Sequence, residues 1–193
     1  LPQALEGCSY VVDYRPVLFA GLLGHWGQLG PAEIEPKRAW TFRQVAWHAH
    51  RLGIAMDTPA QHPFNPLALL RLGLASAPAA GLPNRRVVEL LMRHAWRGGA
   101  DANDPDRLRA LHAAVAPQRD PAGEPVKAEL RAHTEVAIER GLFGVPGFEL
   151  DGRLFWGLDA LPMLRAALQG DPWFDGPAWD AAALAPPGVV RGA

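Results

Sequence analysis

Cysteine is almost absent from this chain of 193 residues, in which Cys8 is the single example. One cysteine excludes an internal disulfide framework and a CxxC redox pair within these residues. Low cysteine usage is typical of proteins from a reducing compartment, so we expect a cytoplasmic protein.

Long apolar runs, a basic stripe and metal-ligand spacings are missing as well. No apolar run is long enough to cross a bilayer. Charges of both signs are mixed along the chain and the formal net charge is −1, so nucleic acid is not an expected partner. His48 and His50 stand two apart in a predicted helix and face different sides, and no HxxxH spacing or glycine-rich phosphate loop occurs. We therefore expect neither a metal nor a nucleotide.

The most informative pattern lies between residues 141 and 159. A predicted helix ends at Gly141, and Pro146 opens a short apolar run that reaches Leu150. Asp151-Gly152 is a strong hairpin turn signal, and residues 153–156 form a second run before another helix. We predict a cis peptide bond before Pro146, which would leave nearby backbone amides facing a ligand. This order of elements is typical of the end of a thioredoxin-like domain.

The rest of the chain alternates one predicted strand with several predicted helices. Residues 9–19 are rich in β-branched and aromatic types and predict a strand that ends near Pro16. Residues 21–36 read as a glycine-bearing connection. Helical spacing and capping signals predict helices over 37–52, after Asn65-Pro66, from Asn84 to Gly98, after Asp104-Pro105, and over 125–140.

Both ends of the chain carry expectations of their own. Residues 1–7 read as the end of a helix that stops at Gly7, and we expect that residues are missing upstream, including the first strand of the sheet. The tail from Gly170 on is rich in proline and glycine and contains Trp173 and Trp179. We predict that it packs as irregular chain over the surface and then frays.

Several motifs in this order resemble those of 2-hydroxychromene-2-carboxylate isomerases, which are related to the kappa-class glutathione transferases. The motifs cover most of residues 1–168 and comprise residues 15–18 (RPVL), 30–34 (GPAEI) with Lys37-Arg38, 62–66 (HPFNP), 141–146 (GLFGVP) and 155–159 (FWGLD). The resemblance implies an α/β fold, a DsbA-type thioredoxin-like sheet with a large inserted helical domain. The domain limits it implies are 1–36 and 123–170 for the two thioredoxin-like parts, 37–122 for the helical insertion, and 171–193 for a C-terminal tail.

The resemblance also implies an activity, a cofactor and a partner. Relatives bind glutathione noncovalently, and its thiol adds reversibly to an unsaturated carbon of an aromatic 2-oxo acid, so that a bond can rotate before elimination. For 2-hydroxychromene-2-carboxylate this is a step in naphthalene-type catabolism. The serine that would assist the thiol is expected upstream of Leu1, so no catalytic residue is assigned within the chain. Relatives are typically homodimers, and the expected substrate is a small aromatic acid.

Site residues follow from the motifs one by one. The Val145 backbone would pair with the cysteinyl backbone of glutathione along an edge set by Pro146, and Lys37 would meet the glycyl carboxylate. The Leu158 backbone and Asp159 would hold the γ-glutamyl end, with the carboxylate facing the ammonium. Gln28 lies near the position of an asparagine close to the thiol in relatives, and Trp40 and Asn65 are expected to contact the substrate. The family arginine after Asp159 is Ala160 here, and the usual threonine after the proline is Gly147.

Each of these residues also has a simpler structural interpretation. Asp159 and Asn65 could be helix caps, Lys37 a solvated lysine in a first turn, and His62 a satisfied loop histidine. Tryptophans are more often core residues than substrate walls, which applies to Trp26, Trp40, Trp47 and Trp156. Cys8 is interpreted as structural.

Three functions remain open at this point. The first is the glutathione-dependent isomerase. The second is a kappa-like glutathione transferase or a DsbA-type thiol-disulfide oxidoreductase on the same fold. The third is a non-catalytic module that has kept the fold and lost the chemistry.

Overall fold

The computed structural model of the chain describes residues 1–184 and residue 188. The chain divides into two compact units. The first, called the hairpin unit here, consists of residues 1–11 together with residues 144–193. The second, called the helical unit, consists of residues 12–143. Each unit has its own core, and each is described by itself.

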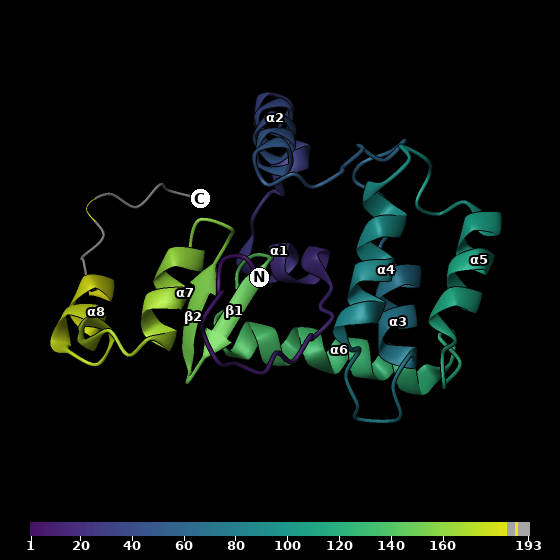
Figure 1. Cartoon of the computed structure of the whole chain (residues 1–193). Helices are drawn as coiled ribbons and strands as arrows, with labels where there is room; N and C mark the ends of the chain where they lie inside the picture. The colour runs from purple at the N-terminus through teal and green to yellow at the C-terminus, as the bar shows by residue number, and fades with distance from the viewer. Residues whose placement is uncertain (185–187, 189–193) are drawn as a thin grey trace. The chain divides into compact units, whose positions relative to one another are not determined.

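The described elements of the helical unit are all helices, coloured from purple to green in Figure 1. Helix α6 packs against α1 and α3, while α4 packs against α3 and α5. Helix α2 packs chiefly on η1 and extends away from the other helices in Figure 1. The bounds are α1 Phe19–Trp26, η1 Pro31–Glu33, α2 Glu35–Arg51, α3 Leu67–Ala75, α4 Arg85–Trp96, α5 Pro105–Val115 and α6 Glu124–Glu139.

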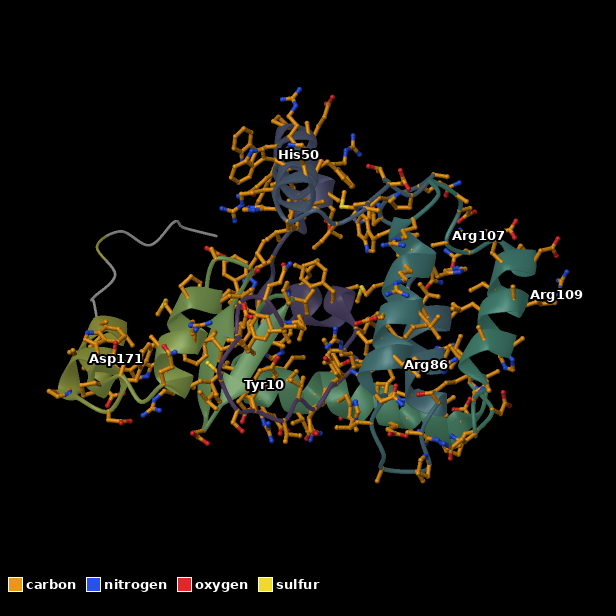
Figure 2. All side chains as sticks on the ribbon, viewed as in Figure 1. Tyr10, His50, Arg86, Arg107, Arg109 and Asp171 are labelled. Atoms are coloured by element: carbon orange, nitrogen blue, oxygen red, sulfur yellow. The ribbon has the colours of Figure 1, made fainter. Side chains whose placement is uncertain are left out.

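Capping side chains and partly buried arginines hold the helices of this unit together. The Asn84 side chain accepts a hydrogen bond from the Val87 N–H at the start of α4, as the sequence predicted. Asp104 caps α5 in the same way. Arg107 donates to the carbonyls of Asp101 and His94 and thereby joins α5 to the end of α4 (Figure 2). Arg119 donates to the carbonyls of Leu74 and Ala77 and pairs with Glu129 on α6. These bonds satisfy backbone groups that would otherwise be left at helix ends.

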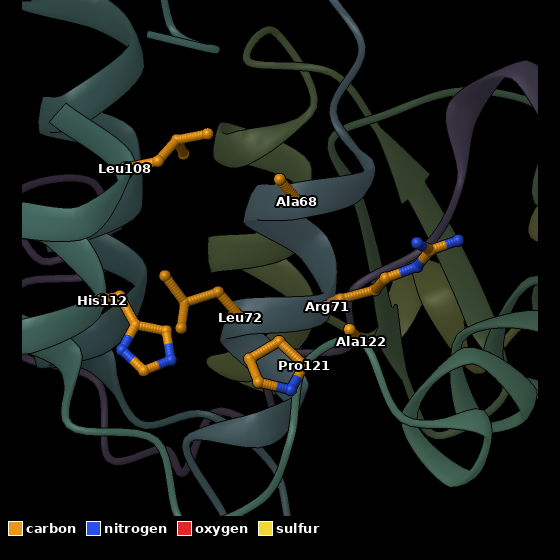
Figure 3. A pocket seen from close by; sticks show the side chains of 7 residues that line it. All are labelled: Ala68, Arg71, Leu72, Leu108, His112, Pro121 and Ala122. Carbon is orange, nitrogen blue, oxygen red and sulfur yellow. The ribbon is translucent and has the colours of Figure 1, made fainter. Parts of the chain in front are cut away.

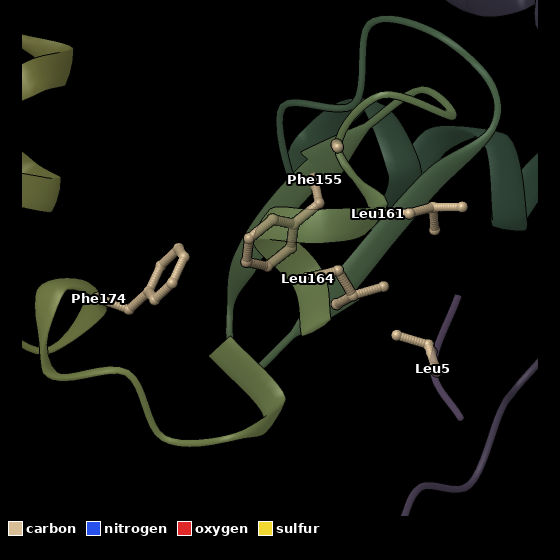
Figure 4. Packing of buried hydrophobic residues seen from close by; sticks show 6 residues of the cluster. Leu5, Phe155, Leu161, Leu164 and Phe174 are labelled. Atoms are coloured by element: carbon tan, nitrogen blue, oxygen red, sulfur yellow. The ribbon is translucent and has the colours of Figure 1, made fainter. Parts of the chain in front are cut away.

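The hairpin unit is built on a two-stranded antiparallel sheet of β1 (Gly147–Leu150) and β2 (Arg153–Trp156). Its other elements are α7 (Leu161–Leu168), η2 (Pro172–Phe174) and α8 (Pro177–Ala183). Its core gathers Leu5, Phe155, Leu161, Leu164 and Phe174, shown in Figure 4. An Arg165 guanidinium bond to the Ala4 carbonyl joins α7 to the N-terminal segment.

The predicted hairpin is confirmed. Gly147 pairs with Trp156 and Leu150 with Arg153, so the turn consists of Asp151 and Gly152. Both turn residues have positive φ values, 49° and 80°, as a two-residue hairpin turn of type I′ requires. The predicted helices at α2 and α6 are confirmed to within two residues at each end.

The predicted strand over residues 9–19 is wrong. Residues 9–18 have no regular secondary structure, and α1 begins at Phe19. A β-rich composition forms a strand only beside a partner strand, and here the segment bonds to α6 instead. The Leu18 N–H donates to Thr134 Oγ1 of α6 at 3.0 Å.

Helix α1 itself was missed, because its glycines favoured a connection over residues 21–36. An ideal Cβ at Gly21 would lie 3.0 Å from Thr134 Cγ2, so this glycine permits the close approach of α1 to α6. The helix ends at Gly27, whose φ is 61°.

The described part of the tail is more ordered than predicted. Asp171 caps η2 by accepting from the Trp173 N–H, and α8 follows. Phe174 is buried, with its ring centre 5.9 Å from that of Phe155. Aromatic burial therefore outweighs the proline and glycine content of this segment. The predicted fraying lies at residues 185–187 and 189–193, outside the described residues.

Four tryptophans that the sequence analysis interpreted as core residues are exposed in the structure. Trp26, Trp40, Trp47 and Trp156 are exposed by 43, 63, 55 and 51 %, so none is a core residue. Among the described residues no helix combines the length and apolar character needed to span a bilayer. The domain limits predicted from the sequence stay a prediction, because the two units described above do not test them.

Candidate ligand-binding site

The edge before β1 carries the strongest of the predicted site features. The Val145–Pro146 peptide bond is cis, as predicted. The Pro146 carbonyl accepts a hydrogen bond of 2.9 Å from the Gly157 N–H, which joins the edge to the turn after β2. Val145 is 41 % exposed, and neither its N–H nor its C=O has a hydrogen-bond partner within the described residues of the hairpin unit. An extended ligand backbone can therefore pair with Val145.

The turn after β2 offers two further groups. Leu158 is 43 % exposed, and its N–H has no partner within the described part of the unit, although its carbonyl accepts from Leu161. Asp159 is exposed, and its carboxylate folds back over Gly157, where an ideal Cβ would lie 2.5 Å from Oδ1. With a φ of 89°, Gly157 takes a conformation that side chains disfavour. The turn thus offers a donor, the Leu158 N–H, and an anionic acceptor, the Asp159 carboxylate, on consecutive residues.

The interpretation of Asp159 as a helix cap is wrong. The residue at the N-cap of α7 is Ala160, and no side chain caps this helix. No hydrogen bond or ion pair of the Asp159 carboxylate occurs among the described residues of its unit. A carboxylate without a structural bond is available to a cationic group.

The other predicted residues belong to the helical unit. Gln28 follows the glycine at the end of α1, and its N–H donates to the Leu23 carbonyl at 2.9 Å, while its side chain is exposed. Lys37 is exposed in the first turn of α2, and its carbonyl accepts from the Thr41 hydroxyl at 2.8 Å. Trp40 lies three residues further along the same helix, so Lys37 and Trp40 share one face of α2.

Asn65 serves as a turn residue in the structure. Its Oδ1 accepts from the Leu67 N–H at 3.1 Å, and the N-cap of α3 is Pro66, one residue later than predicted. The bond is consistent with the structural interpretation of Asn65. A contact between Asn65 and substrate stays a prediction.

His62 is not the satisfied loop histidine of the sequence interpretation. Its ring packs edge-on to Phe42, with centres 5.1 Å apart, and also contacts Phe64 and Trp96. Its Nδ1 is buried with no hydrogen-bond partner. Burial lowers the pKa of His62 from its usual range because a charged imidazolium would be poorly solvated there.

The helical unit also contains a hollow of about 250 Å³, shown in Figure 3. Its walls are largely aliphatic, and the Arg71 side chain extends away from His112 in this view. None of the predicted site residues lines it; its lining is Ala68, Arg71, Leu72, Leu108, His112, Pro121 and Ala122. Among residues 1–184 and 188, no group of three or more His, Cys, Asp or Glu side chains could hold a metal ion.

Sequence reasoning missed one pair of residues beside the Val145 edge. Gly144 is buried, and an ideal Cβ there would lie 2.4 Å from Trp156 Nε1, so the indole packs directly on this glycine. Alternation along β2 could have revealed the position of Trp156. Because Phe155 is buried, period-two geometry directs Trp156 to the opposite face of the hairpin.

The fold and these features correspond to a known class. The family model of the DSBA-like thioredoxin domain matches residues 3–169, and the chain belongs to this family. The predicted DsbA-type thioredoxin fold is therefore confirmed.

Two individual proteins resemble the chain over most of its length. The 2-hydroxychromene-2-carboxylate isomerase of Sphingobium xenophagum is 27 % identical over 178 residues, which cover 87 % of this chain and 88 % of that protein. A solved structure of a 2-hydroxychromene-2-carboxylate isomerase superposes with a TM-score of 0.66 at 20 % identity, covering 91 % of this chain and 85 % of the other. The similarity to the solved structure shows the fold. Both proteins are named as 2-hydroxychromene-2-carboxylate isomerases, the family that the sequence motifs resemble.

Proposed function

We propose that the protein is a glutathione-dependent isomerase of 2-hydroxychromene-2-carboxylate or a similar aromatic 2-oxo acid. The observation that carries the proposal is the exposed backbone of Val145, without a hydrogen-bond partner in its unit, joined through Pro146 and Gly157 to the turn of Leu158 and Asp159. The similarity to a protein named as such an isomerase supports the same reaction class.

The groups at this edge fit the γ-glutamyl-cysteinyl part of glutathione. The Val145 N–H and C=O are a donor and an acceptor for the cysteinyl backbone. The Leu158 N–H would donate to the γ-glutamyl carboxylate, and the Asp159 carboxylate would accept from its ammonium. In this proposal Lys37 meets the glycyl carboxylate, Gln28 lies near the thiol, and Trp40 and Asn65 contact the substrate.

The chemistry supplied by glutathione is a reversible addition of its thiol to the conjugated double bond of the substrate, which permits rotation before elimination. The chain's part is to fix the tripeptide so that the sulfur meets that carbon in one orientation. Each bond to a backbone group also removes freedom from the bound tripeptide before the reaction begins. The protein itself gives up no group in the cycle.

Two measurements test the proposal. Titration calorimetry with glutathione should show binding, and S-methylglutathione should bind as well, because none of the assigned bonds uses the thiol. Absorbance should then show interconversion of 2-hydroxychromene-2-carboxylate and its ring-opened isomer only when glutathione is present. Isomerisation at the same rate without glutathione would contradict the cofactor assignment. Absence of glutathione binding would favour a non-catalytic module.

We also propose that the protein acts as a homodimer, as the resemblance implies, and that it acts in the cytoplasm, as its low cysteine content favours. Light scattering on the purified protein tests the dimer directly. A monomer across micromolar concentrations would contradict it.

A further inference from the structure

We propose that Trp156 is a positioning residue, which holds the Val145 edge in the conformation that binds glutathione. This inference rests on the proposed function and assigns a role to a side chain that the sequence motifs leave without one. Two close approaches carry it, one on each side of Val145.

The first approach is between Trp156 and Gly144. An ideal Cβ at Gly144 would lie 2.4 Å from Nε1, 3.1 Å from Cε2 and 3.2 Å from Cδ1 of Trp156. Three atoms of the rigid indole therefore occupy the space that any side chain at 144 would need. Gly144 is not among the residues with positive φ, so the indole, and not the backbone conformation, requires glycine here.

The second approach is between Gly157, the residue after Trp156 at the end of β2, and Pro146. The Gly157 N–H donates to the Pro146 carbonyl at 2.9 Å. Trp156 and Gly157 thus contact residues 144 and 146, the two neighbours of Val145. The strand pair of Gly147 with Trp156 extends this attachment into the sheet.

Val145 lies between these two attached residues, and its backbone has no hydrogen bond to the β2 end among the described residues of the unit. Its neighbours are held, while its own backbone groups remain exposed. A segment fixed in this way loses little freedom when a ligand pairs with it, and preorganisation of this kind raises affinity without a new contact. Trp156 acts through Gly144 and need not touch the ligand.

A double-mutant cycle tests the proposal. The variants are Trp156→Ala, Gly144→Ala and the double substitution, each measured for glutathione affinity by calorimetry and for the ¹⁵N order parameter of the Val145 amide without ligand. We expect either single substitution to raise the Kd about tenfold. The order parameter should fall from about 0.85, the value of rigid backbone, in Trp156→Ala. The double variant should be no weaker than the weaker single variant, because removal of the indole makes room for the new methyl group.

Trp173→Ala is the matched control. Trp173 lies in the same unit and is 43 % exposed, against 51 % for Trp156, and it contacts Phe174 and Trp179. We expect it to leave both readouts unchanged. Circular dichroism of each variant establishes that the hairpin unit is folded.

Two results would overturn the proposal. One is a Trp156→Ala variant with the original Kd and order parameter. The other is a cycle in which the two losses simply add. If the unaltered protein does not bind glutathione, the proposed function fails, and the order parameters of the cycle still decide the role of Trp156.

Discussion

The hairpin unit and the helical unit differ in their cores and in how they satisfy their polar groups. The hairpin unit packs aromatic rings, with the centres of Phe155, Phe174 and Trp179 between 5.5 and 5.9 Å apart. The helical unit has buried aliphatic clusters, for example Leu74 with Val126 and Leu130.

The polar groups differ in the same way. In the helical unit Asn84, Asp104 and Arg119 bond the backbone at helix ends. In the hairpin unit the backbone groups of Val145 and the N–H of Leu158 have no such partner among its described residues. Exposed groups of this kind add nothing to stability and are available to a ligand, so the comparison separates a scaffold from the proposed binding edge.

The largest expected effect is on the cores. Phe155→Ala should lower the free energy of unfolding of the hairpin unit by about 3–5 kcal/mol, because the substitution leaves a cavity among Phe174 and Leu164. Leu74→Ala should cost the helical unit about 2–5 kcal/mol for the same reason. Hydrogen exchange by mass spectrometry measures both units at once. If a variant first lost hydrogen-exchange protection in the unit that was not substituted, the two cores would not be separate and the comparison between the units would fail.

The next effect concerns ligand affinity. Asp159→Ala should weaken glutathione binding by about 1–3 kcal/mol, the size of a lost charge-assisted hydrogen bond, with little change in stability. Calorimetry measures the affinity. Asp180→Ala on α8 is the control, since it removes an exposed carboxylate from the same unit, and it should bind as before. Unchanged affinity in Asp159→Ala would remove this residue from the site.

Substitution of Asn84 is expected to lower stability and to leave ligand affinity unchanged. Asn84→Ala should lower the stability of the helical unit by about 1 kcal/mol, because α4 loses the bond to the Val87 N–H. Glutathione affinity should not change. Thermal unfolding and calorimetry on one preparation give both values, and Asn84→Asp serves as the control because it retains a capping oxygen. A variant as stable as the original protein would show that water caps α4 equally well.

The smallest effect is a pH dependence confined to one unit. All seven histidines lie between residues 12 and 143, in the helical unit. Burial lowers the pKa of both His62 and His133 below the ordinary value of 6.5. The unfolded chain therefore binds more protons than the folded unit as the pH falls below 6.5, and the stability of the helical unit should fall with it. The hairpin unit has no histidine to produce such a change.

Unfolding followed from pH 7.5 to 5.5 measures this dependence. The double substitution His62→Gln and His133→Gln should flatten it, and His50→Gln, an exposed residue of α2, should not. An unaltered slope in the double variant would assign the pH dependence to other groups.

Much of the fold could be predicted because local signals agreed with the tertiary structure. Asp151-Gly152 specified the hairpin, and Asn84 and Asp104 specified the starts of two helices. The strand over residues 9–19 and the missing α1 were errors of one kind. The Thr134 side chain of α6 accepts a hydrogen bond from the segment that composition assigned to a sheet, and Gly21, which composition assigned to a loop, allows α1 to approach α6 closely.

The candidate site was predictable only in part. The motifs pointed to Val145, Pro146, Leu158 and Asp159, and the structure joins these four through one hydrogen bond from Gly157 to Pro146. The exposure of Trp40, Trp47 and Trp156 was not predictable from residue type, since tryptophan is buried in most settings.

By itself the sequence determined the features that depend on neighbours along the chain. These are the tight turn at Asp151-Gly152, the caps at Asn84 and Asp104, and the ends of helices at glycines, all of which follow from local backbone geometry. Only the tertiary structure decided which backbone groups stay without partners and which glycine is required by space. Gly144 shows why: it is needed because an indole twelve residues away occupies the volume of its missing side chain, and no local pattern encodes such a contact.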